Sequence, residues 1–241
     1  MVRTHLIRWK NWLEKQKSWT EDYKGIEMTE QFIKILFPQT KDVSVVVSII
    51  DRYKDKFGLN TDLRLGQFLA QVREEVGPEF KVVRENRNYS SVALTKVYKA
   101  FNQKLADKYG RNSEHGSDDV SIANIAYANK LGNGNADSDG DGDMDKDDDG
   151  WKYRGAGCLQ ITGKYNFEEV QKRCLKYAGK EVDPDTMEGF ILFGMAYWIW
   201  RDIYVQADTG NPDKVTAVIN KYTDSYESRS KHFNSIKHLI S

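Results

Sequence analysis

Cysteine and proline are scarce in this sequence. Its 241 residues include two Cys, Cys158 and Cys174, and four Pro. Two cysteines cannot build the disulfide framework that stabilises many small secreted domains, so we expect buried, free thiols instead. Stability must then come from an apolar core, and a hydrophobic content of 39% is sufficient to form one.

Long apolar runs are missing as well. The N-terminal stretch from Met1 to Trp9 has charges inside each candidate apolar segment, so we expect neither a signal peptide nor a transmembrane helix. No helix-turn-helix, zinc-finger or RNP-type pattern occurs, and we therefore expect no nucleic acid partner. A His/Cys cluster of the kind that holds zinc is also absent from the sequence.

The formal net charge is zero, but the charges are unevenly distributed. Residues 137–149 contain eight Asp and one Lys, a net charge of −7, so the rest of the chain carries +7. A basic body suits an anionic polymer such as a bacterial cell wall. Thirteen Tyr and six Trp supply aromatic faces that sugars can stack on, although core and rim positions explain any single aromatic equally well.

Helical periodicity prevails along the chain. Residues 1–27 form an extension in which Leu6, Trp9 and Leu13 fall at helical spacing, and packing on the domain is favoured over a partner or a membrane. Residues 28–241 form the main domain, with a small β element over 150–162. Its predicted helices cover residues 28–38, 42–57, 61–76, 90–109, 118–131, 164–179, 186–204 and 211–239. The expected fold is α+β and mostly α-helical.

Two carboxylates stand out in and after the helix over 61–76. An apolar stripe predicts its buried face: Leu65, Phe68, Leu69, Val72 and Val76. Glu75 falls at the edge of this stripe, in the last turn before Gly77, where burial and the helix dipole disfavour a charged carboxylate, as a general acid requires. Glu74 is predicted to point to solvent. Glu85 follows ten residues later, but two such acids alone are more often surface residues.

Several motifs together resemble glycoside hydrolase family 19, which holds plant-type chitinases and many phage or bacterial endolysins. Phe68-Leu-Ala-Gln71 with Glu75 and Gly77 resembles the family's Phe-Leu-Ala-Gln-x-x-His-Glu-x-Gly helix. The segment from Glu85 to Ser90 resembles Glu-Asn-Leu-Asn-Tyr-Ser. Residues 153–166 resemble Tyr-Arg-Gly-Arg-Gly-x-Ile-Gln-Leu-Thr-Gly-x-x-Asn-Tyr. The motifs agree with the family in order and spacing. The resemblance covers about residues 28–236 and implies a lysozyme-like fold.

The resemblance also implies roles for individual residues. Glu75 corresponds to the family's general acid, Glu85 to its proposed general base, and Thr162 to the residue that holds the attacking water. These roles describe an inverting mechanism without a covalent intermediate. The implied substrate-binding residues are Gln160, Asn166, Tyr89, Tyr153, Asn220 and Arg229.

Two positions depart from the family pattern. Glu74 stands where the family has His before the acid, and Ala156 stands where it has the second Arg of Gly-Arg-Gly. Both departures leave open a different class of function, in which the chain is a catalytically weak glycan-binding or virion structural protein. Binding to cell walls without release of reducing ends would favour that class.

The aspartate-rich insert has the pattern of a calcium loop. Asp137, Asp139 and Asp141 take positions 1, 3 and 5, and Gly142 takes position 6, where a sharp turn is needed. The remaining predicted ligands are Asp143, Asp145 and Asp148. Hard oxygen ligands favour Ca²⁺ over softer metals, and a disordered acidic loop is the competing interpretation. Bound Ca²⁺ is expected to order Trp151 and Tyr153 beside the substrate.

The resemblance, the basic body and the expected lack of a signal peptide favour an endolysin-type hydrolase that cuts peptidoglycan glycan strands. A chitinase is the alternative within the same enzyme class. We expect the protein to act as a monomer, without an organic cofactor. It would stay in the host cytoplasm until a holin releases it to the wall, or travel on a virion.

Overall fold

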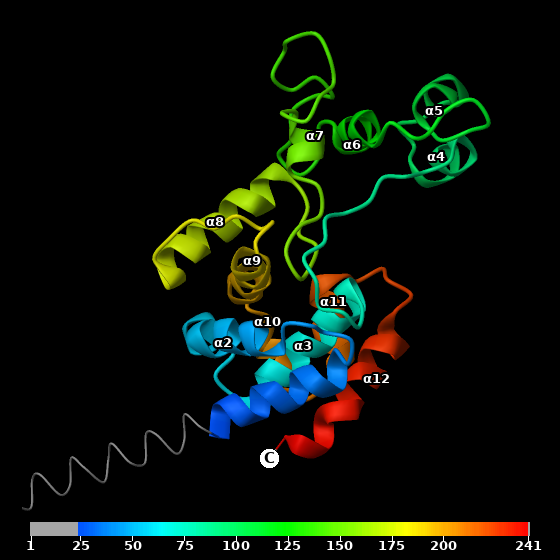
Figure 1. Ribbon diagram of the computed structural model, residues 1–241. Helices are drawn as coiled ribbons and strands as arrows, with labels where there is room; N and C mark the ends of the chain where they lie inside the picture. Colours follow the sequence, from blue (N-terminus) through cyan, green and yellow to red (C-terminus); the bar gives the residue numbers. More distant parts are fainter. Residues whose placement is uncertain (1–23, 241) are drawn as a thin grey trace, which may run out of the picture. The chain divides into compact units, whose positions relative to one another are not determined.

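The computed structural model describes residues 24–240, and Figure 1 shows that this part of the chain consists of helices and connecting loops. It divides into two compact units, the second formed by Lys81–Arg201 and the first by the residues on either side. The predicted helix around Leu6 lies outside the described residues. Residues 24–27 of the predicted extension belong instead to the first described helix, which covers 24–36.

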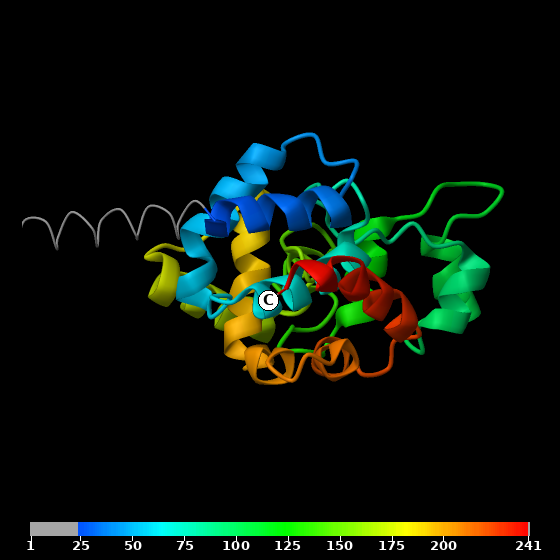
Figure 2. The same cartoon turned by 90° about the horizontal axis from the view of Figure 1, so that it is seen from below.

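The first unit joins helices from both ends of the described chain. Its elements are helix 24–36, α2 (Val43–Tyr53), η1 (Lys54–Phe57), α3 (Asp62–Val76), α10 (Ile203–Ala207), α11 (Pro212–Ile219), α12 (Tyr226–Ile236) and η2 (Lys237–Leu239). Helices α3 and α12 contact each other extensively, and Figures 1 and 2 both show them side by side. The contact joins residues of α3 to residues far away in the sequence.

Helix α3 confirms the predicted apolar stripe. Its predicted core residues are all buried: Leu65, Phe68, Leu69, Val72 and Val76. Thr61 caps the start of the helix by accepting a hydrogen bond from the Arg64 backbone N–H at 3.2 Å. Gly77 ends it with a positive φ of 75°, a backbone conformation that favours glycine. The helix therefore begins and ends almost where the sequence predicted.

The second unit contains α4 (Ser91–Val97), α5 (Gln103–Tyr109), α6 (Asp119–Tyr127), α7 (Asp149–Lys152), α8 (Lys164–Ala178) and α9 (Met187–Trp200). Helices α8 and α9 pack together around Phe167 and Phe193, whose ring centroids lie 5.0 Å apart. Cys158 and Cys174 are buried and free, as predicted. Burial raises the pKa of the Cys174 thiol to about 12, so this thiol stays protonated and unreactive.

Three predicted helices are each divided in two. The helix predicted over 90–109 stops after Val97, and Asn102 caps a new one by accepting from the Leu105 N–H at 2.9 Å. The helix over 186–204 breaks at Asp202, whose φ of 49° is left-handed. The helix over 211–239 ends at Ile219 and resumes at Tyr226. Local caps and one left-handed residue decide these breaks, which apolar periodicity does not report.

The predicted small β element is not formed in the described residues. Residues 150–162 contain the end of α7, a set of turns and one isolated antiparallel bridge between Ala156 and Ile161. Gly157 and Gln160 adopt φ angles of 69° and 50°, which lie outside the β region. Within residues 24–240, no helix has the length and apolar character needed to cross a membrane.

A pair of glycine substitutions tests the packing of this turn. Gly157 and Gly179 are both left-handed, but a Cβ on Gly157 would lie 2.5 Å from Phe193 Cβ, whereas nothing lies within 4 Å of one on Gly179. We expect Gly179→Ala to lower the free energy of unfolding by about 1 kcal/mol through backbone strain alone. Gly157→Ala should cost about 3 kcal/mol because overpacking adds to strain. Equal losses in denaturant unfolding would contradict this packing.

Candidate active site

The predicted acid, Glu75, is held by an arginine from the other end of the chain. Arg229 of α12 forms an ion pair with Glu75, with 2.6 Å between Nη2 and Oε1. The Arg229 side chain is only 3% exposed, and its other nitrogens donate to Gln71 Oε1 and Ser225 Oγ, both at 2.9 Å. Because these partners fix the guanidinium, the Glu75 carboxylate has a cation at a defined position.

This contact changes the surroundings that the sequence predicted for Glu75. The sequence placed Glu75 at an apolar edge near the helix end, and the structure adds a guanidinium at hydrogen-bond distance. The prediction was incomplete because Arg229 reaches α3 only through the packing of α12. Glu75 is 20% exposed, so its carboxylate is still open to solvent.

Glu74 is also engaged by α12, and the prediction that it points to solvent is wrong. Its Oε2 accepts a hydrogen bond from Ser228 and lies 3.1 Å from His232 Nε2. Burial and the nearby charge of Arg73 lower the pKa of His232, while its hydrogen bond with Glu74 acts in the opposite direction. The departure at position 74 is therefore accommodated by a polar cluster built on the same helix pair.

The predicted base, Glu85, belongs to the second unit and is held by a different set of donors. Its backbone N–H donates to the Gly155 carbonyl at 3.0 Å, and the Gly155 N–H donates to Glu85 Oε2 at 3.1 Å. The Tyr127 hydroxyl lies 3.0 and 2.8 Å from the two carboxylate oxygens. Arg87 completes the set with an ion pair. The carboxylate is thereby oriented from three sides.

Arg87 is the residue that sequence reasoning missed. Its side chain is 1% exposed, and its guanidinium donates hydrogen bonds to the hydroxyls of Tyr98 and Tyr127. The guanidinium also lies 4.5 Å from the ring centroid of Tyr127, within cation–π distance. Burial raises the pKa of Tyr98, so its hydroxyl stays neutral beside the arginine. The available signal was an Arg two residues after Glu85, at the position where the family pattern has Leu.

Three further predicted residues form a connected series in the second unit. The Thr162 hydroxyl donates to the Gln160 carbonyl at 3.3 Å, and Asn166 Nδ2 donates to the Thr162 carbonyl at 2.7 Å. Gly155 links this series to Glu85: a Cβ on Gly155 would lie 3.0 Å from Glu85 Cβ and 3.1 Å from Gln160 Oε1. A Cβ here would crowd both side chains, so glycine favours this close approach, which brings Gln160 next to the predicted base.

The remaining predicted substrate residues are distributed over both units. In the second unit, Tyr89 accepts a hydrogen bond from the Tyr98 hydroxyl at 3.3 Å, and the Tyr153 ring packs edge-on against Phe167. In the first unit, Asn220 is exposed at the end of α11. Each unit thus carries one of the two candidate carboxylates together with some of the substrate residues.

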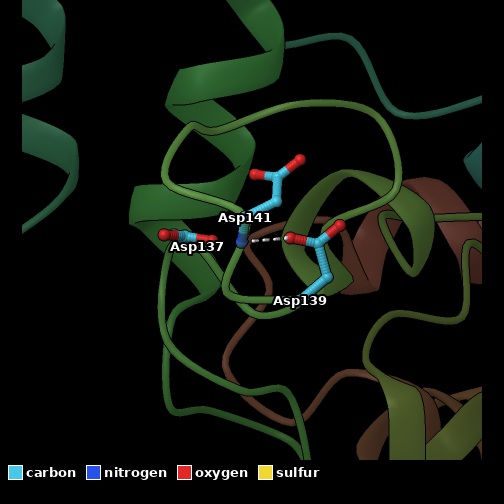
Figure 3. Close-up of side chains that lie close together, drawn as sticks. All are labelled: Asp137, Asp139 and Asp141. Carbon is cyan, nitrogen blue, oxygen red and sulfur yellow. Dashed lines mark hydrogen bonds between the residues drawn. The ribbon is translucent and has the colours of Figure 1, made fainter.

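The aspartate-rich loop brings carboxylates together, as Figure 3 shows for Asp137, Asp139 and Asp141. One carboxylate oxygen from each of these three lies within 4.8 Å of the others, and the same holds for Asp141, Asp143 and Asp145. Repulsion from Asp141 raises the pKa of Asp143. Gly142 has a φ of 104°, in keeping with the predicted turn. Hard oxygen donors so close to one another fit a divalent cation.

Asp148, the twelfth residue of the predicted loop, lies apart from these groups. It is fully buried, and its carboxylate accepts hydrogen bonds from the Ser138 hydroxyl at 3.0 Å and the Asp145 N–H at 2.9 Å. Burial acts to raise the pKa of Asp148, but these two donors and the backbone N–H groups of Ser138 and Asp139 outweigh it, and the pKa is lowered. Asp148 also lies 3.3 Å from Asn124 Nδ2, so it fastens the loop to α6.

A hollow of about 670 Å³ in the first unit does not coincide with either carboxylate. It lies between helix 24–36 and α2, and its lining includes Val43 and Val47 with charged residues around them. Neither Glu74 nor Glu75 contributes to it. We therefore assign this hollow no part in the chemistry of the site.

Replacing Arg87 tests how strongly its contribution to stability depends on Glu85. We expect Arg87→Met to lower the free energy of unfolding by about 3 kcal/mol, because it removes a buried guanidinium that pairs with Glu85 and donates to Tyr98 and Tyr127. Arg111→Met, at an exposed arginine, should stay within about 0.5 kcal/mol of the wild type. Combining Arg87→Met with Glu85→Gln should cost less than the sum of the two changes. Additive losses in denaturant unfolding would refute the coupling.

Comparison with known proteins indicates the family of this chain. No protein-family model matches the chain. A protein of Haemophilus influenzae, named glycosyl hydrolase family 19 domain-containing protein, is 32% identical to it over 205 residues. The matched region covers 83% of this chain and 91% of that protein, so the similarity extends over both units.

Proposed function

Since this chain belongs to glycosyl hydrolase family 19, we propose that it is an endolysin-type enzyme that cleaves the glycan strands of peptidoglycan. Family membership supports a glycoside hydrolase with a glycan substrate. The observation that carries the finer proposal is the ion pair between Glu75 and Arg229, because it joins the two residues that the sequence assigned to the acid and to the substrate-binding arginine.

In the proposed reaction, Glu75 protonates the glycosidic oxygen as the bond to the leaving sugar breaks. Glu85 accepts a proton from a water molecule that attacks the anomeric carbon on the opposite face, and Thr162 positions this water. The anomeric centre inverts in one step. The donors on Glu85 support this role, because a carboxylate held by Arg87, Tyr127 and Gly155 keeps one orientation.

The charge of the chain favours peptidoglycan over chitin as the proposed substrate. Outside residues 137–149 the chain carries a net charge of +7, which attracts a polymer with carboxylates more strongly than a neutral one. Chitin remains the second candidate substrate, and a glycan-binding or virion structural role is the alternative of another class. As part of the proposal, the protein acts as a monomer and reaches the wall through a holin or on a virion.

Release of reducing ends from purified peptidoglycan tests the reaction. We expect Glu75→Gln and Glu85→Gln each to lower the rate by roughly 10²–10⁴-fold, the contribution typical of general acid–base catalysis. Glu114→Gln, at an exposed glutamate, should act as the wild type. NMR of the newly formed reducing end should show inverted anomeric configuration. Near-normal turnover by Glu75→Gln would remove the acid assignment. Faster cleavage of chitin oligomers would favour a chitinase, and wall binding without cleavage would favour the non-catalytic class.

We also propose that the aspartate-rich loop binds Ca²⁺ through Asp137, Asp139, Asp141, Asp143 and Asp145. The converging carboxylate oxygens and the turn at Gly142 support this proposal. Asp148, which the sequence assigned as the closing ligand, is proposed to secure the ends of the loop by accepting hydrogen bonds from the Asp145 N–H and the Ser138 hydroxyl. Bound Ca²⁺ would then supply charge neutralisation and order to a loop whose charges repel one another.

Calorimetric titration with Ca²⁺ tests this site. Asp141 belongs to both carboxylate groups, whereas Asp147 is exposed in the same loop and belongs to neither. We expect Asp141→Asn to weaken binding by at least roughly tenfold, because ligand number and charge set affinity in such loops. Asp147→Asn removes the same charge and should have little effect. Absence of binding at millimolar Ca²⁺, or equal losses in the two variants, would rule the site out.

A further inference from the structure

A row of aromatic rings lies on the outside of the second unit. It consists of Tyr165 at the start of α8 and Tyr197 and Trp200 at the end of α9, and we call it the aromatic row. Ring centroids lie 5.9 Å apart for Tyr165 and Trp200 and 5.8 Å apart for Tyr197 and Trp200, both in edge-to-face geometry. Tyr165 is 54% exposed, and the other two rings are partly exposed.

Packing between α8 and α9 does not account for this row. The two helices are already joined by an inner aromatic pair, Phe167 and Phe193, which are 7% and 0% exposed. Tyr165 instead leaves more than half of its surface in water, although its ring lies edge-on to that of Trp200. An outer row of rings beside a complete inner contact is more typical of a binding surface than of a core.

Two arginines border the aromatic row. The Arg201 guanidinium lies 5.9 Å from the Tyr197 ring centroid and 5.7 Å from that of Trp200, and Arg173 lies 5.7 Å from Trp200. Arg173 is paired with Glu169. Arg201 is exposed, and no ion pair found among residues 24–240 includes it. Its hydrogen-bond donors are therefore available to an anion that approaches the rings.

We propose that the aromatic row binds a carboxylate-bearing glycan strand, in addition to the residues that act on the scissile bond. The apolar C–H faces of sugars stack on aromatic rings, and a planar guanidinium binds carboxylates with two parallel hydrogen bonds. The row begins one residue before Asn166, which is assigned to the substrate on the same helix. This inference rests on the proposed function and adds that the strand extends over the start of α8.

The experiment measures binding to insoluble polymers by cosedimentation, in a Glu75→Gln background that preserves the polymer. Tyr165→Ala and Arg201→Gln test the row. Tyr222→Ala and Lys221→Gln are matched controls, because Tyr222 is 92% exposed and Lys221 lies 5.7 Å from its ring, in the first unit. Purified peptidoglycan and chitin are the two polymers, and reducing-end release is measured in parallel with Glu75 intact.

We expect Tyr165→Ala to raise the Kd for peptidoglycan roughly tenfold, a loss of about 1.4 kcal/mol. Arg201→Gln should weaken binding to peptidoglycan more than to chitin, and its effect should shrink at high salt. Both controls should bind as the unsubstituted protein. Equal binding by Tyr165→Ala and Tyr222→Ala would overturn the inference. Equal effects of Arg201→Gln on both polymers would overturn the proposal that the bound strand is recognised through its carboxylates.

The same measurements separate this inference from the proposed function. Cleavage of peptidoglycan with binding that does not depend on Tyr165 would overturn the aromatic row and leave the hydrolase standing. Binding that depends on Tyr165 without release of reducing ends would support the row and overturn the hydrolase. Absence of both binding and cleavage would overturn both.

Discussion

The ion pair between Glu75 and Arg229 is the contact on which the position of the proposed acid depends. It joins the last turn of α3 to α12, and the same pair of helices holds Glu74 beside His232. Burying a guanidinium is costly unless its donors are satisfied, and Gln71 and Ser225 satisfy them. The catalytic proposal therefore rests on a packing arrangement that sets both the position and the charge surroundings of one carboxylate.

The second unit also holds a candidate carboxylate in place, but with different residues. Glu85 is held by a buried arginine, a tyrosine hydroxyl and a backbone N–H, and the close approach of Gly155 brings Gln160 to the same place. Both candidate carboxylates thus carry a nearly fully buried guanidinium. A fixed cation holds a carboxylate in one orientation, which favours a role in positioning and proton transfer over a role as a solvated surface acid.

The uneven distribution of charge along the chain supports both the proposed peptidoglycan substrate and the proposed glycan binding by the aromatic row. The acidic charge is concentrated in residues 137–149, where Asp148 secures the loop, and the remaining residues carry the opposite charge. If a cation neutralises the loop, the basic surface that remains suits an anionic glycan. The exposed Arg201 beside the aromatic row is one place where that surface offers both stacking and charge.

The sequence by itself determined the mostly helical fold, the stripe on α3, the free thiols and the family, because periodicity, end signals and motif spacing are local properties of the chain. Glu75, Glu85 and the loop aspartates were predicted from the sequence as candidate site residues. The prediction that Glu74 points to solvent is wrong, and the small β element predicted over 150–162 is not formed in the described residues. Only the tertiary structure decided that Arg229 reaches Glu75, that α12 engages Glu74 and that Arg87 holds Glu85. The contacts of Glu74 and Glu75 join residues distant in sequence, whereas Arg87 and Glu85 are near neighbours. Such contacts form only when the helices pack, because packing brings polar groups within hydrogen-bond distance of one another.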